Sequence, residues 1–159
     1  MSTAPDTPMV RGARYRHTNI ISRDWMRLSA FYERVFGCQR LPPERDLQGE
    51  WLDRGTGIVG ARLRGVHLRL PGFGAEGPTL EIFEYDEILA RETPVPNRAG
   101  FGHIAFAVED VGQAVEAVIA AGGAPLGEIV QQDIPGAGRL CFSYVRDPEG
   151  NIVELQAWS

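Results

Sequence analysis

The chain has 159 residues and a formal net charge of -5, from 16 lysines and arginines against 21 aspartates and glutamates. This acidic balance is opposite to that of a phosphate-binding surface, so we expect no nucleic-acid partner. No apolar run approaches the roughly 18 residues of a membrane span, and residues 1–12 carry prolines and an acid where a signal peptide needs an apolar stretch. Length and composition therefore predict one domain that does not enter a membrane.

The two cysteines indicate the compartment. Cys38 and Cys141 are far apart in the sequence and match no CxxC pattern. Two reduced thiols in a cytoplasmic protein are the simplest interpretation, because paired cysteines are typical of secreted domains.

The first predicted element is a strand at the beginning of the domain. In RYRHTNII, His17 and Asn19 fall on one face because side chains alternate along a strand. Asp24 is placed to cap the helix that follows, whose apolar residues recur at helical spacing until Gly37 ends it. The segment 39–51 contains two prolines and a charged run, and it predicts either an edge strand or a mobile loop.

The first half continues with two strands. Alternating apolar residues predict a long, bent strand over 58–70, in which His67 and Arg69 point away from the apolar set. A turn rich in glycine and proline leads into a strand over 79–85, with Glu81 on one side and aliphatic residues on the other.

The second half repeats this order. Residues 102–108 predict a strand that carries His103. Asp110 is placed to cap the next helix, which two adjacent glycines end. Strands are then expected over 125–132, 139–146 and 151–158, with a DPEG turn between the last two.

The two halves form an internal repeat. In each half a strand histidine stands the same distance before the capping aspartate, and each half closes with a strand that carries a glutamate, Glu81 or Glu154. We therefore expect a disordered lead over 1–12 and a single domain over 13–159, made of module one (13–86), a linker (87–99) and module two (100–159).

Four residues of the repeat are candidate metal ligands: His17, Glu81, His103 and Glu154. A carboxylate in an apolar strand is costly to bury unless it is paired or binds a cation. Two glutamates at corresponding places, each with a strand histidine, point to one mixed nitrogen and oxygen site for a divalent ion such as Zn, Ni, Co, Mn or Fe. The competing interpretation has ordinary hydrogen-bonded histidines and a salt bridge from Glu81 to Arg62, Arg64 or Arg69.

Several neighbouring residues are candidate substrate contacts. His67 lies on a strand that should border the metal site, so it is either a base or an ordinary surface histidine. Arg69, Arg139 and Tyr144 either bind a substrate anion or are solvated strand positions. Glu84 is excluded as a ligand, because alternation places it on the other face of its strand.

Two motifs carry a resemblance to a known family: GHIAFAVEDV over 102–111 and RDPEGNIVEL over 146–155. They resemble the vicinal oxygen chelate superfamily, which includes glyoxalase I, methylmalonyl-CoA epimerase, extradiol dioxygenases, and fosfomycin and bleomycin resistance proteins. The resemblance covers about residues 14–158. It implies an α+β fold in which two βαβββ modules form a curled mixed sheet around a metal-binding cleft. The implied ligands are His17, Glu81, His103 and Glu154.

Within this family Glu81 discriminates between branches. Dioxygenase and fosfomycin-type members bind metal with three protein ligands, whereas members with four belong to the glyoxalase and epimerase branch. The resemblance therefore implies a metal-dependent lyase or isomerase that stabilises an enediolate of a small carbonyl, thiol-adduct or thioester substrate, with Glu154 or Glu81 as base. The alternatives are an Fe(II) ring-cleaving dioxygenase and a non-catalytic small-molecule binding or resistance protein. A homodimer is expected, because closed two-fold dimers are the commonest oligomers.

Overall fold

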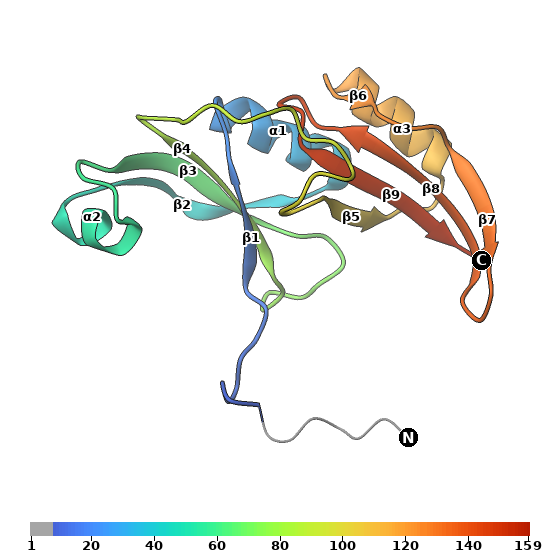
Figure 1. The fold of residues 1–159 in the computed structure, drawn as a ribbon, viewed down its shortest axis with the longest axis horizontal. Helices are drawn as coiled ribbons and strands as arrows, with labels where there is room; N and C mark the ends of the chain where they lie inside the picture. The colour runs from blue at the N-terminus through green and yellow to red at the C-terminus, as the bar shows by residue number, and fades with distance from the viewer. Residues whose placement is uncertain (1–7) are drawn as a thin grey trace.

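The structure, a computed structural model, describes residues 8–159, so residues 1–7 of the expected disordered lead lie outside this part. In chain order the elements are β1 (His17–Ile21), α1 (Trp25–Phe36), β2 (Gln39–Gln48), α2 (Glu50–Thr56), β3 (Arg62–Arg69), β4 (Thr79–Tyr85), β5 (Ile104–Ala107), α3 (Val111–Ala120), β6 (Ala124–Pro125), β7 (Val130–Ile134), β8 (Gly138–Arg146) and β9 (Ile152–Trp158). Sheet A has the strand order β1-β4-β3-β2, and sheet B has the order β5-β9-β8-β6, with β7 also paired to β8. The two sheets lie side by side (Figure 1).

Each sheet follows the same plan. β1 pairs in parallel with β4 and β5 pairs in parallel with β9, whereas the other strand pairs are antiparallel. Parallel neighbours need a long crossover connection, and α1 and α3 begin these connections. The α+β fold with two βαβββ modules and mixed, curled sheets is confirmed, with the second strand of module two divided into β6 and β7.

Both long helices begin at the expected caps. The Asp24 carboxylate accepts a hydrogen bond from the backbone N–H of Arg27 at 3.0 Å, and Asp110 accepts one from that of Gln113 at 2.9 Å. Each such cap contributes about 1 kcal/mol. Gly37 ends α1 in the left-handed conformation, with φ 71°. Among residues 8–159 no helix is long and apolar enough to span a membrane.

The helices bury the aliphatic faces of both sheets in one core. Ile82 of sheet A and Leu155 of sheet B are fully buried within the same cluster. At the junction of the modules the ring of Phe36 stacks on that of Phe106, with centroids 3.9 Å apart. Each buried aliphatic side chain contributes about 1.5–3 kcal/mol relative to an exposed one. The modules therefore stabilise one another, and the opposite face of each sheet, called its open face below, is left for function.

Three stretches differ from the sequence prediction. The ambiguous segment 39–51 forms β2 as far as Gln48, with a register shift between Leu41 and Arg45. β3 begins at Arg62 and not near residue 58, because the residues after α2 form a turn. The strand expected over 125–132 is divided into two short strands that both pair with β8.

Helix α2 is not predicted by the sequence. It has only seven residues, begins after Gly49 and ends at Gly57 in the left-handed conformation. So short a helix has too few turns to show a helical apolar period. Its Leu52 packs with Leu63 and Phe83 on the open face of sheet A, so α2 covers one end of that face.

The DPEG turn of module two is bonded to α1 of module one. The buried carboxylate of Asp147 accepts hydrogen bonds from the Tyr32 hydroxyl at 2.8 Å and from the Asn151 side-chain amide at 2.7 Å. Glu149 accepts one from the backbone N–H of Arg23. Burial raises the pKa of Asp147, and its hydrogen bonds oppose that rise. The turn therefore fixes one module to the other.

Tyr32→Phe is expected to lower the free energy of unfolding by about 1–3 kcal/mol, because the buried Asp147 carboxylate loses a donor. Urea denaturation followed by tryptophan fluorescence measures the change. Tyr85→Phe, at a half-buried position of β4, is the matched control and should change the same quantity by less than about 0.5 kcal/mol. An equal loss in both variants would contradict the role given to the Tyr32 hydroxyl.

Candidate metal centre

The open face of sheet A carries the first candidate pair. Backbone pairing places Glu81 between Asn19 of β1 and His67 of β3. His17 Nε2 lies 2.7 Å from Glu81 Oε2, and His67 Nε2 lies 3.1 Å from Glu81 Oε1. Glu81 is only 7% exposed. Both of its oxygens are therefore held by imidazoles in an almost buried position.

The salt bridges that compete for Glu81 do not form. Arg62 binds Asp46 at 2.9 Å, and Arg64 binds Asp86 at 3.0 Å. The partners of Glu81 are thus the histidines, an arrangement that both the metal site and ordinary hydrogen-bonded histidines would give.

The electrostatics of this pair fit a bound cation. Burial raises the pKa of Glu81, and the charges of His17 and Arg45 only partly oppose the rise. Burial also lowers the pKa of His67, and the charge of Arg45 lowers it further. The site therefore holds a carboxylate that is short of positive charge beside an imidazole that favours its neutral, metal-ligating form. Such donors suit a divalent first-row ion.

Sheet B carries the second pair at corresponding positions. His103 Nε2 lies 3.1 Å from Glu154 Oε2. Tyr144 pairs with Glu154 across β8 and β9, as His67 pairs with Glu81 across β3 and β4. The ring of Tyr144 lies 4.9 Å from that of His103, measured between centroids. The repeat is therefore preserved in three dimensions, but a phenol in module two takes the place of an imidazole in module one.

The structure joins each histidine to the glutamate of its own module but does not gather all four into one group. The two pairs lie on different sheets. Within residues 8–159 no three histidine, cysteine, aspartate or glutamate side chains are arranged to hold one metal ion. The single four-ligand site expected from the sequence stays a prediction, and it requires the two pairs to approach one another.

The other candidate contacts divide into two groups. His67 and Tyr144 lie beside the glutamates, and Arg69 lies on the same open face as His67. Arg139 binds Asp133 of β7 at 3.3 Å. Alternation along β8 places Arg139 on the opposite face from Tyr144, so it does not border the second pair.

Sequence reasoning misses two residues beside the first pair. Arg45 of β2 pairs with Gly65, two residues before His67 on the same face of β3, but the register shift in β2 interrupts the alternation that would reveal its face. Asn19 faces Glu81 directly. Its parity with His17 is visible in the sequence and was the signal that could have identified it.

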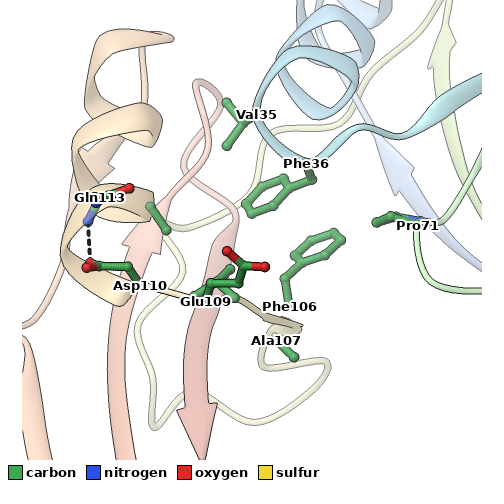
Figure 2. A pocket seen from close by; sticks show the side chains of 10 residues that line it. Val35, Phe36, Pro71, Phe106, Ala107, Glu109, Asp110 and Gln113 are labelled. Carbon is green, nitrogen blue, oxygen red and sulfur yellow. Dashed lines mark hydrogen bonds between the residues drawn. The ribbon is translucent and has the colours of Figure 1, made fainter.

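A cavity of about 690 Å³ lies between the end of α1 and the start of α3. Figure 2 shows Phe36 and Phe106 lining it, with Asp110 bonded to Gln113 at its side. None of the four candidate ligands lines this cavity. We therefore do not assign it to the metal centre.

Comparison with known proteins identifies the family. The model of the Glyoxalase/Bleomycin resistance protein/Dioxygenase superfamily matches residues 14–155. No curated protein sequence matches the chain.

Several solved structures share the fold. A glyoxalase family protein from Bacillus cereus has a TM-score of 0.72 and 22% identity, over 98% of this chain and 99% of that chain. A mutant glyoxalase I from Zea mays has a TM-score of 0.62 and 25% identity, over 90% of this chain but 44% of that chain. A glyoxalase family protein from Enterococcus faecalis has a TM-score of 0.58 and 22% identity, over 92% of this chain and 99% of that chain. Because the family model matches most of its length, the chain belongs to the glyoxalase/bleomycin resistance protein/dioxygenase superfamily.

Proposed function

We propose that the protein is a metal-dependent lyase or isomerase of the glyoxalase and epimerase type, acting on a small carbonyl compound. The observation that carries this proposal is the pair of His–Glu contacts at corresponding positions of the two modules. Two imidazoles and two carboxylates form a donor set for a divalent ion. A three-ligand dioxygenase site would not need Glu81, a carboxylate that is costly to bury without a cation.

Members of the donor set have distinct tasks in this proposal. A divalent ion held by His17, Glu81, His103 and Glu154 would supply Lewis-acid stabilisation of the charge that develops on a carbonyl oxygen. The protein's own groups orient the substrate and remove a proton from the carbon next to that carbonyl.

Glu154 is the better placed base of the two glutamates. Both oxygens of Glu81 are held by imidazoles. Among the described residues, only His103 hydrogen-bonds to the Glu154 carboxylate, through one oxygen. The other oxygen can accept a proton without the loss of that bond. In this proposal Tyr144, which pairs with Glu154 from the neighbouring strand, donates a hydrogen bond to the same substrate.

We also propose that a second copy of the chain completes the site. The two pairs lie on the open faces of different sheets, and the open face of sheet B carries the half-buried ring of Phe142 and the exposed ring of Trp158. Open apolar faces of this kind are typical of protein interfaces. In a two-fold dimer, sheet A of one copy can face sheet B of the other, which joins the four ligands twice.

Elemental analysis tests the metal site. The protein is loaded with Zn, Ni, Co or Mn, and unbound ion is removed. We expect about one ion per chain in the wild type and loss of most of it in Glu81→Ala and His103→Ala, because each variant lacks one of four donors. Glu116→Ala, on the exposed side of α3, is the control and should load like the wild type.

Three outcomes would count against the proposal. Wild-type protein that loads none of these ions contradicts the site itself. Full metal content and activity in Glu81→Ala would favour the three-ligand dioxygenase. Deuterium exchange from solvent into candidate carbonyl substrates tests proton removal directly, and an absence of exchange with any of them leaves the lyase or isomerase activity without support.

A further inference from the structure

The open face of sheet A carries two arginines that the proposed metal site does not use. Among residues 8–159, Arg45 and Arg69 form no ion pair, whereas the other arginines of β2 and β3 are each paired with a carboxylate: Arg40, Arg62 and Arg64. This contrast occurs in a chain whose acids outnumber its bases, with a net charge of -5. Acidic partners are therefore plentiful, yet neither guanidinium binds a carboxylate of the described residues; Arg45 donates only to the backbone carbonyl of Pro43.

Arg69 also has a buried donor without an acceptor. Its Nε is shielded from solvent and makes no hydrogen bond within the described residues. Arg146, at the corresponding position of module two, donates to the Gly150 carbonyl at 3.0 Å. Because an unsatisfied buried donor costs free energy, such a group in a folded protein calls for a missing partner.

The two arginines flank the first candidate pair. Arg69 lies two residues beyond His67 on β3, and it pairs with the same residue of β4, Thr79, as His17 does from β1. Arg45 lies on the other side of His67, because it pairs with Gly65, two residues before His67 on β3. Two residues along a strand span about 7 Å, so both side chains can reach a small molecule bound at the pair.

We propose that Arg69, assisted by Arg45, binds a carboxylate of the substrate beside the His17–Glu81 pair. A guanidinium presents two parallel N–H donors that match the two oxygens of a carboxylate. The substrate class is then a small oxo or hydroxy acid, with its carbonyl and its carboxylate close enough to occupy both places at once. This choice of substrate rests on the proposed function, whereas the anion site itself requires no metal.

Calorimetric titration of the metal-free protein tests the anion site separately from the metal. The probes are pyruvate, inorganic phosphate and hydroxyacetone, which resembles pyruvate but has no charge. We expect pyruvate to bind and hydroxyacetone to give no measurable heat. Arg69→Met should weaken pyruvate binding about ten- to a hundredfold, because a charge-assisted contact is lost. Arg64→Met, on the same strand but paired with Asp86, should bind pyruvate like the wild type.

Equal affinity for pyruvate and hydroxyacetone would overturn the proposal, as would an equal loss of pyruvate binding in Arg64→Met. Tighter binding of phosphate than of pyruvate would overturn the carboxylate assignment in favour of a phosphoryl group. Arg69→Lys keeps the charge and should retain more affinity than Arg69→Met, and Arg45→Gln repeats the test should Arg69→Met not fold. Arg69→Met should still load metal fully, so failure of the anion site is distinguishable from failure of the metal site.

Discussion

Two chains that are each defective in metal binding are expected to restore one site when they are combined in one dimer. Glu81→Ala removes the glutamate of the His17–Glu81 pair on sheet A, and Glu154→Ala removes that of the His103–Glu154 pair on sheet B; each pair is called a half-site. Each homodimer should lose on the order of a hundredfold or more in metal affinity, because loss of a ligand costs at least as much as loss of the group that orients it. In the heterodimer, one shared site carries both substitutions and the other carries neither.

Differently tagged chains that are purified as the heterodimer allow this measurement. We expect about one metal ion per heterodimer and about two per wild-type dimer, as two-fold symmetry requires of a shared site. A heterodimer without metal would show that each site lies within one chain. The proposal that two copies share each site would then be wrong. The heterodimer of Glu81→Ala with wild type is the control, because it keeps one intact site in either arrangement.

Gly65→Ala is expected to prevent stable folding of sheet A. A Cβ at this position would lie 2.0 Å from the carbonyl oxygen of Ile82 and 2.7 Å from the ring of Phe83. Both residues belong to β4, which β1 holds on its other side. The contact is relieved only if β3 moves away from β4. We expect the free energy of unfolding to fall by about 4 kcal/mol or more, which is exceptional for a single substitution.

Thermal and urea unfolding measure this loss. Gly74→Ala is the matched control, since a Cβ there meets no atom within 4 Å, and it should change stability by less than about 0.5 kcal/mol. Because Gly65 lies in the strand that carries His67, any folded fraction of Gly65→Ala should also load metal poorly. Stability like that of the wild type would show that β3 and β4 can separate at little cost.

Features that depend on neighbouring residues could be predicted from the sequence. Alternation alone places Glu84 on the opposite face from Glu81, and the structure confirms this, because Glu84 accepts a hydrogen bond from the backbone N–H of Trp25 on the core side. The caps Asp24 and Asp110 are equally local. Since these local patterns occur twice in the same order, they also predict the two βαβββ modules.

Features that depend on distant residues could not be predicted in this way. The placing of one module against the other relies on contacts such as the stacking of Phe36 on Phe106, which no local pattern contains. Arg45 could not be placed because the register shift after Leu41 interrupts alternation in β2. The histidine and glutamate of each module could therefore be paired by parity, whereas the relation between the two pairs could not.

The two half-sites are alike in backbone and unlike in side chains. Next to its glutamate, sheet A has His67 where sheet B has Tyr144, and it has Asn19 where sheet B has Ala105. A substrate with two different ends can distinguish these sides, so it binds in one orientation across them. In the proposed reaction, the base would then meet only one of the two hydrogens on a prochiral carbon. A fold made of two near-copies would thus give a stereospecific reaction through the few positions at which the copies differ.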